Sequence, residues 1–176
     1  MNLPTYEGLE ERHVSGSGRA SHRSPSPARR GLAAGTVAAA ALAGLLLGFG
    51  RRAGTSWRPI NAAAHTVLGT RADGVWDFDF TVTPTGVAVV LVISVAAGLV
   101  VARIASPFRR MQVVLAAAGV SLTGYLLHLH VAARTPGGLA ALLTVGELRA
   151  LYVTLAVSLV GGMRFAFLPG TEGNGR

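Results

Sequence analysis

The chain has 176 residues, of which 51% are hydrophobic and only 14% are charged. It has no cysteine, which excludes disulfide bonds, thiolate chemistry and cysteine-ligated zinc. All sixteen basic residues are arginine and the net charge is +8, but the chain has no soluble domain on which they could form a basic face with interleaved aromatic residues. We therefore expect no nucleic-acid partner, and the arginines are better explained as signals of membrane topology.

Four apolar stretches with almost no internal charge dominate the chain, at residues 31–50, 85–104, 111–133 and 139–163. Each is about 20 residues or longer, which a helix needs to cross about 30 Å of hydrocarbon. Lipid offers no hydrogen-bond partners, so the backbone must satisfy its polar groups within helices. The pattern predicts an all-α polytopic membrane protein, with one four-helix membrane domain over residues 31–168 and the lipid bilayer as its direct partner.

The two ends of the chain are predicted to be tails. Residues 1–30 are rich in Ser, Pro, Gly and Arg, which predicts a disordered basic tail, and residues 169–176 form a second, short one. The pair Arg29-Arg30 also resembles an export signal, but no small-residue cleavage site follows, so we expect a retained helix. With the N-terminus inside, ten arginines fall on the inner side and five on the outer side, leaving Arg149 uncounted. This predicts a multi-pass protein of the bacterial inner (plasma) membrane with both termini in the cytoplasm.

The outer connection, residues 51–84, is long enough to carry structure of its own. Pro59 can begin a short helix that ends near Gly69. Within it Asn61 and His65 lie one turn apart, and an apolar stripe occupies another face, formed by Ile60, Ala64, Val67 and Leu68. We expect this loop to be ordered and to cap the outer ends of the third and fourth spans.

Residues 75–82 alternate aromatic and acidic side chains, and two interpretations remain open. Strict alternation predicts a short strand with Trp76, Phe78 and Phe80 on one face. Alternatively, these aromatics and Trp57 form an interfacial belt that seats the loop on the membrane surface.

Small residues recur at the four-residue spacing that lets helices pack closely. Two G-x-x-x-G pairs lie in the first span, Gly31 with Gly35 and Gly44 with Gly48, and the second span offers the row Ser94, Gly98 and Ala102. We expect these rows to pack within the chain, and the alternative is dimerisation.

Polar residues follow two faces of the last spans. In the third span, one face carries Ser121, Gly124, Tyr125 and His128, whereas His130 points elsewhere. In the fourth span, we assign to the bundle interior the face formed by Thr144, Glu147, Leu151, Thr154 and Ser158. Arg149 points away from it and can snorkel to the outer surface.

The candidate site is an outer polar cluster composed of Asn61, His65, Asp77, Asp79, Tyr125, His128 and Glu147. Ionisable groups within a membrane are functional candidates by default. The competing interpretation gives them structural or interfacial roles. No catalytic motif and no tight metal-ligand spacing such as H-x-x-x-H occurs, so we predict no catalytic residue, no metal and no cofactor.

The segment Asn61-Ala62-Ala63-Ala64-His65-Thr66-Val67-Leu68-Gly69, followed by Thr85-Gly86, resembles a motif of small uncharacterised bacterial four-helix membrane proteins. In that family N-A-x-x-H-x-x-x-G follows the first span and T-G opens the second. Here Thr70 replaces the family's acid, and Val and Ala replace the Asn-His pair of its second span. The resemblance implies that Asn61, His65 and Gly69 belong to one local structure, and it implies no activity.

Two functions fit these features. The favoured one is a non-enzymatic scaffold or accessory subunit of a membrane assembly, either a homo-oligomer or a larger complex. The alternative is a small oligomeric transporter or membrane enzyme that uses the outer His/carboxylate cluster.

Overall fold

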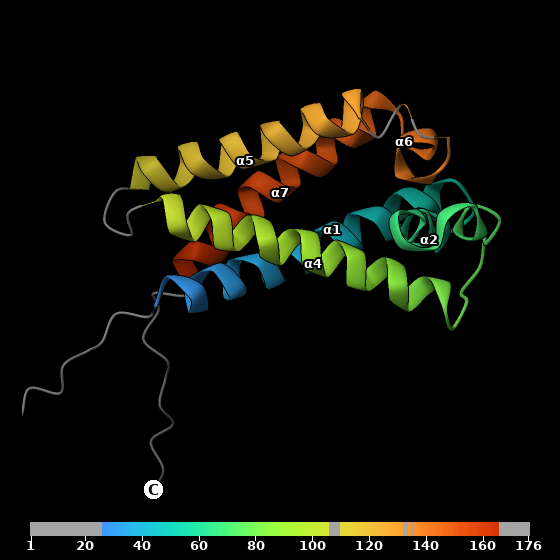
Figure 1. The fold of residues 1–176 in the computed structure, drawn as a ribbon, viewed down its shortest axis with the longest axis horizontal. Helices are drawn as coiled ribbons and strands as arrows, with labels where there is room; N and C mark the ends of the chain where they lie inside the picture. Colours follow the sequence, from blue (N-terminus) through green and yellow to red (C-terminus); the bar gives the residue numbers. More distant parts are fainter. Residues whose placement is uncertain (1–25, 106–109, 132–133, 135, 166–176) are drawn as a thin grey trace, which may run out of the picture.

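Four long helices form the body of the protein. The computed structural model describes residues 26–105, 110–131, 134 and 136–165. The long helices run alongside one another (Figure 1), and they are α1 (Pro27–Arg52), α4 (Val82–Ile104), α5 (Arg110–His130) and α7 (Val145–Phe165). Each is long and apolar enough to cross a membrane. The described chain is thus all-helical with four candidate spans, as the sequence predicts; residues 1–25 and 166–176 lie outside the described part.

Helix α1 begins within the predicted tail. The side chain of Ser26 accepts a hydrogen bond from the backbone N–H of Arg29 (3.3 Å), and Pro27 occupies the first helical position. Both residue types favour a helix start at these positions. Residues 27–30 therefore belong to α1, which is longer at both ends than the predicted span 31–50.

The fourth predicted span, residues 139–163, is divided into two helices. A short helix, α6 (Gly138–Leu142), ends before α7 begins at Val145. The backbone N–H of Thr144 donates to Oε2 of Glu147 (3.0 Å), and the backbone N–H of Glu147 donates to Oγ1 of Thr144 (3.3 Å). This is a capping box, which satisfies N–H groups that the first turn of a helix leaves free. The candidate span is therefore α7 alone.

The helix pair α1–α4 packs through glycines. A Cβ atom added to Gly35 would lie 2.4 Å from Cα of Val95, and one added to Gly98 would lie 2.4 Å from the carbonyl oxygen of Gly31. Only residues without a side chain allow this approach, so the prediction of close packing within the chain is confirmed here. The other small residues of the α4 row are also buried, namely Ser94 and Ala102.

The second G-x-x-x-G pair of α1 faces away from the bundle. Gly44 and Gly48 are exposed, and no atom lies within 4 Å of a Cβ added to either of them. The prediction that this pair packs within the chain is therefore wrong, and the surface of both glycines is free in the described structure.

The interior face of α7 differs from the predicted one. Its buried residues are Leu148, Leu151, Leu155, Leu159, Gly162 and Met163. Of the predicted face only Leu151 is buried, and Thr144 is exposed. The predicted register is wrong because leucines and Gly162 pack against α1; a Cβ on Gly162 would lie 2.5 Å from Cα of Ala34.

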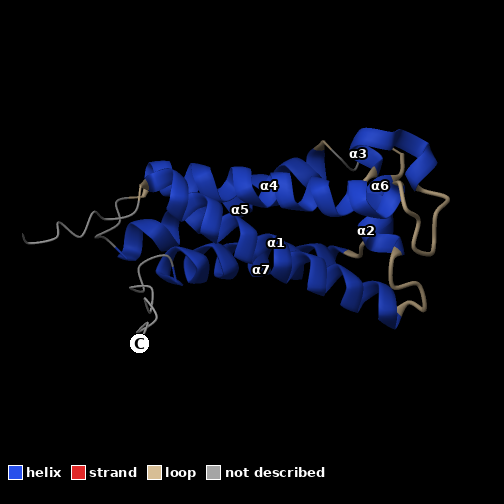
Figure 2. Cartoon of the chain, turned by 90° about the horizontal axis from the view of Figure 1, so that it is seen from below, coloured by secondary structure: helices blue, strands red, loops and turns tan. Residues whose placement is uncertain are grey.

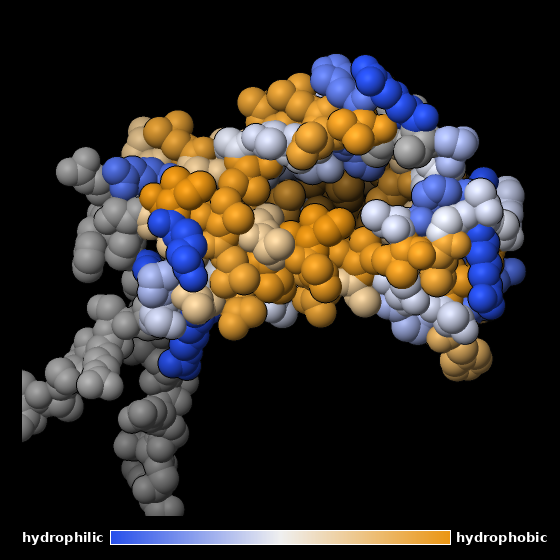
Figure 3. All heavy atoms as spheres, viewed as in Figure 1, coloured by the Kyte–Doolittle hydropathy of each residue, from blue (hydrophilic) through white to orange (hydrophobic). Residues whose placement is uncertain are grey.

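The arrangement of the bundle follows from these contacts. Helix α1 packs against both α4 and α7, whereas α5 packs mainly against α7. Among the residues of α5 only Ala117 and Ser121 are buried. On the face drawn in Figure 3, hydrophobic residues cover the middle of the molecule and hydrophilic residues gather towards its two ends. That distribution suits a protein whose middle lies in lipid.

One end of the bundle, called here the loop end, carries the short helices (Figure 2): α2 (Arg58–Ala63), α3 (His65–Leu68), the 3₁₀ helix η1 (Gly69–Ala72) and α6. The opposite end, which begins at Pro27, is called the tail end. Helix α2 packs against α1, α4 and α6. The loop is thus ordered as predicted, and it covers α4 and α6, not the ends of α5 and α7.

Two details of the loop correct the sequence analysis. The helix expected from Pro59 to Gly69 breaks at Ala64, and this turns Val67 out of the apolar stripe to 66% exposure, whereas Leu68 still packs against Ala64. No strand forms among the described residues of the 75–82 segment, because the backbone there bonds to the side chain of Asn61 and not to a neighbouring strand.

The loop aromatics form an edge-to-face chain at the surface. The ring of Phe78 lies 5.3 Å from that of Trp57 and 5.1 Å from that of Phe80, and the guanidinium of Arg58 lies 3.6 Å from the centre of the Trp76 ring. Phe80 is 89% exposed. Exposed aromatic rings at one end of an apolar bundle, here with the amphipathic indole of Trp76 among them, are typical of an interfacial belt.

Candidate functional site

Asn61 joins α2, the 75–77 segment and α4. Its amide nitrogen donates to the backbone carbonyls of Val75 (3.1 Å) and Asp77 (2.8 Å), and its amide oxygen accepts from the Thr83 hydroxyl (2.7 Å). The side chain is fully buried. A buried amide with three hydrogen bonds holds the loop on the bundle and leaves little capacity for a ligand.

Asp79 caps the start of α4. One carboxylate oxygen accepts hydrogen bonds from the backbone N–H groups of Thr81 and Val82, both at 2.7 Å, and the backbone N–H of Asp79 donates to the Thr83 hydroxyl. The bonds from Val82 and Thr81 hold the pKa of Asp79 below its usual value. Asp79 thus stays ionised at neutral pH as a helix cap. Asp77, by contrast, takes part through its backbone, and its side chain is exposed.

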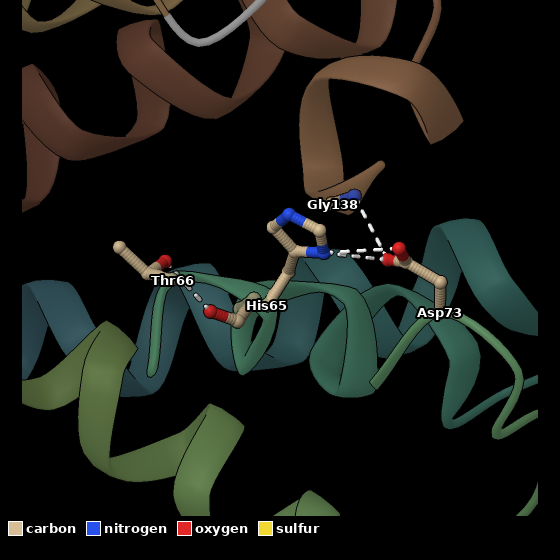
Figure 4. Close-up of polar contacts among 5 residues, drawn as sticks. His65, Thr66, Asp73 and Gly138 are labelled. Atoms are coloured by element: carbon tan, nitrogen blue, oxygen red, sulfur yellow. Dashed lines mark hydrogen bonds and ion pairs between the residues drawn. The ribbon is translucent and has the colours of Figure 1, made fainter. Parts of the chain in front are cut away.

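His65 forms a second polar group with Asp73, which is not among the predicted site residues (Figure 4). Its Nδ1 lies 3.0 Å from the carboxylate of Asp73, which also accepts from the backbone N–H of Gly138 at 2.9 Å. A hydrogen bond from the imidazole to an ionised carboxylate requires a proton on Nδ1, because such a carboxylate only accepts hydrogen bonds. The pair fastens the loop to the start of α6.

Gly137 and Gly138 make this contact possible. Both have positive φ, +101° and +68°, and a Cβ on Gly137 would lie 2.3 Å from the Asp73 carboxylate. A half-open hollow of about 130 Å³ lies beside the contact, and its lining includes Arg58 and Asp73. Both charged residues also serve the tertiary structure, Arg58 by its contact with the Trp76 ring and Asp73 by its bonds to His65 and Gly138.

A third group of residues lies between α5 and α7. Tyr152 packs edge-to-face on Tyr125 (5.8 Å between ring centres), and its hydroxyl lies 3.4 Å from Nδ1 of His128. Arg149 donates from Nε to the hydroxyl of Tyr125 (3.3 Å). Gly124 allows the approach, since a Cβ there would lie 2.8 Å from the Tyr152 ring. The face of the third span that carries Ser121, Gly124, Tyr125 and His128 therefore packs onto α7.

Glu147 belongs to none of these groups. Its carboxylate accepts from the backbone N–H and the hydroxyl of Thr144, at 3.0 and 2.9 Å. The contacts between described residues thus divide the seven predicted site residues into four groups. Asn61, Asp77 and Asp79 form the first group, and His65 pairs with Asp73 in the second. Tyr125 and His128 lie between α5 and α7, and Glu147 belongs to the cap of α7.

Three residues of these groups were missed by sequence reasoning, namely Thr83, Asp73 and Tyr152. Thr144 was assigned to the interior face of the fourth span, although the capping box Thr144-x-x-Glu147 has a recognisable sequence signature. The three missed residues gave no comparable signal, because Thr83 bonds to Asn61, Tyr152 to His128 and Asp73 to Gly138 across 22, 24 and 65 residues. Among the described residues, no three His, Asp or Glu side chains stand close enough to hold a metal ion.

These features define an all-helical chain with four helices able to cross a membrane, fastened at one end by a hydrogen-bonded loop. No protein-family model, curated protein or solved structure matches the chain.

Proposed function

We propose that this protein is a small, non-catalytic integral membrane protein that acts as a scaffold or accessory subunit of a membrane assembly. The observation that carries the proposal is the free small-residue face of α1, called here the α1 face, formed by Ala40, Gly44 and Gly48. All three residues are exposed. Such a row lets the backbone of another transmembrane helix approach closely.

The contrast within α1 supports a partner helix. Gly31 and Gly35 already accommodate α4, and their geometry is that of a closed small-residue interface. Gly44 and Gly48 repeat the same spacing on another face, with open space above both. Contact with lipid chains alone does not require a second row of small residues, because lipid chains pack around leucine as well as around glycine.

The loop end supports a structural role. Asn61, Asp79 and Glu147 all bond to backbone groups, and the His65–Asp73 pair fixes the start of α6. Polar residues used in this way stabilise a rigid end.

We further propose that the tail end faces the cytoplasm of a bacterial inner membrane. By sequence, ten arginines belong to the segments that adjoin the tail end, against five in those that adjoin the loop end, with Arg149 uncounted. Cytoplasmic ends of spans are enriched in arginine. The described arginines of the tail end are Arg29, Arg30, Arg103, Arg110 and Arg164.

Cross-linking tests the α1 face. Because the chain has no natural cysteine, an introduced cysteine is its only thiol. Gly48→Cys labelled in native membranes with a thiol-reactive photo-cross-linker, which needs no thiol on the partner, should give an adduct with one partner of defined mass. A partner mass equal to that of the chain identifies a homo-oligomer, and another mass identifies a heteromeric assembly. Gly161→Cys is the control, because Gly161 is also open but lies on α7. Equal adduct yields at the two positions would contradict the proposal.

A further inference from the structure

A groove runs along the surface between α5 and α7, with a volume of about 250 Å³. Small residues hollow it, Ala118 on α5 and Ala156 on α7, and larger apolar side chains flank it, Leu122 and Val153. From Arg149 to Ala156 the groove follows seven residues of helix, about 10 Å towards the middle of the bundle. Its lining is thus mostly apolar, with Ser121 and two tyrosines among the lining residues and the cation of Arg149 at the loop end.

Arg149 is held at that mouth in a defined position. Its Nε donates to the Tyr125 hydroxyl at 3.3 Å, and the Tyr125 ring is in turn packed against Tyr152. The side chain is exposed, and its two terminal amino groups form no hydrogen bond to the described residues. The nearby carboxylate of Glu147 is engaged in the α7 cap. The guanidinium therefore keeps four N–H donors, on its two terminal nitrogens, and a charge without an ion pair for an external anion.

The groove also contains a polar atom without a protein partner. Ser121 is only 4% exposed, and its Oγ has no hydrogen-bond partner in the described structure, although it lines the groove. A buried hydroxyl without a partner points to a bound group that supplies an acceptor. The ester carbonyls of a phospholipid lie between its headgroup and its acyl chains, which places acceptors between Arg149 and the apolar part of the groove.

From these observations we propose that the α5–α7 groove binds one anionic phospholipid of the leaflet at the loop end. The phosphate and anionic headgroup lie at Arg149, an ester carbonyl accepts from Ser121, and one acyl chain lies along Ala118 and Ala156. Charge complementarity selects an anionic lipid over a zwitterionic one, and the apolar groove selects a lipid over a free phosphate.

Native mass spectrometry of the delipidated full-length protein in detergent tests the site, with phosphatidylglycerol or phosphatidylcholine added. We expect one phosphatidylglycerol per chain to bind about tenfold more tightly than phosphatidylcholine, the ratio that one charge-assisted contact supplies. Arg149→Gln should abolish this preference. Arg164→Gln, at the exposed far end of the same helix, should keep it. If both variants lost the preference for phosphatidylglycerol equally, Arg149 would be no more than a general lipid contact, and the proposal would be overturned.

A second variant tests the groove independently of the charge. Ala156→Leu fills it and should weaken binding of both lipids, whereas Val157→Leu, at a position 65% exposed and outside the lining, should not. Thermal unfolding of each variant checks that it is folded. Soluble glycerol phosphate at the same concentration should not displace the lipid. Unchanged binding in Ala156→Leu, or displacement by glycerol phosphate, would show that the groove contributes nothing and would refute the site.

Discussion

Substituting Gly35 by Ala should separate the two helices that contribute most to the bundle. The added methyl would lie 2.4 Å from Cα of Val95 and 2.8 Å from the carbonyl oxygen of Ser94. Carbon atoms in favourable contact lie about 3.5–4.0 Å apart, so α1 and α4 must move apart by about 1 Å. The obstacles are backbone atoms, which cannot rotate away as a side chain can.

Gly44→Ala provides the matched control, because it makes the same chemical change in the same helix with no atom within 4 Å. The gain in helix propensity, about 0.5–1 kcal/mol, is common to both variants and cancels in their difference. What remains is the overpacking cost at Gly35. We expect Gly35→Ala to be less stable than Gly44→Ala by about 1–3 kcal/mol in free energy of unfolding.

Reversible unfolding in mixed micelles, followed by circular dichroism at rising SDS fraction, measures this difference. Gly98→Ala should behave like Gly35→Ala, and the double variant should cost less than the sum of the single ones, because both methyl groups meet at one crossing. If Gly35→Ala and Gly44→Ala agree within about 0.5 kcal/mol, the usual range for surface substitutions, α1 and α4 do not cross at these glycines.

Three further predictions concern the loop end. Asn61→Ala removes three buried hydrogen bonds and should lower the free energy of unfolding by about 2–3 kcal/mol, measured by the same titration; a loss below about 0.5 kcal/mol would show that the loop is not fastened there. Glu147→Gln should be tolerated, since glutamine also completes a capping box, whereas Glu147→Leu should cost about 1 kcal/mol, and equal stability of the two would argue against the cap. The lowered pKa of Asp79 means that its cap stabilises the fold above its usual pKa of about 4 and is lost as the pH falls through the lower folded-state value. The stability advantage of the parent over Asp79→Asn should therefore shrink as the pH drops below about 4, and an advantage independent of pH between about 6 and 3 would contradict the assignment.

Hydropathy was sufficient to predict the class of fold and the approximate spans. Their ends were less predictable, because local caps decide where helices begin. Ser26 and Pro27 extend α1, and the Thr144–Glu147 box divides the fourth apolar stretch although its composition is continuous. Both signals are present in the sequence, but a prediction based only on the length of the apolar stretches does not use them.

The orientation of α7 could not be derived from polarity. In water an apolar face must be buried, but helices in lipid pack by shape, so polar positions need not face inward. The packing of Gly162 against Ala34 fixes how α7 contacts α1. In this orientation Thr154 and Ser158 lie beside the buried face of α7 and are only partly buried. The polar groups were unpredictable for another reason. Asp73 and Gly138 are 65 residues apart, and nothing local in the sequence connects them.

The proposed role as a subunit is tested most directly by the mass of the protein extracted from native membranes with its surrounding lipid. The chain alone is 18.1 kDa. We predict a stoichiometric complex of higher mass that Gly48→Leu dissociates and Gly161→Leu leaves intact, because both glycines are open but only Gly48 belongs to the α1 face. A single 18.1 kDa chain in the parent protein, or a complex equally stable in Gly48→Leu, would contradict the account.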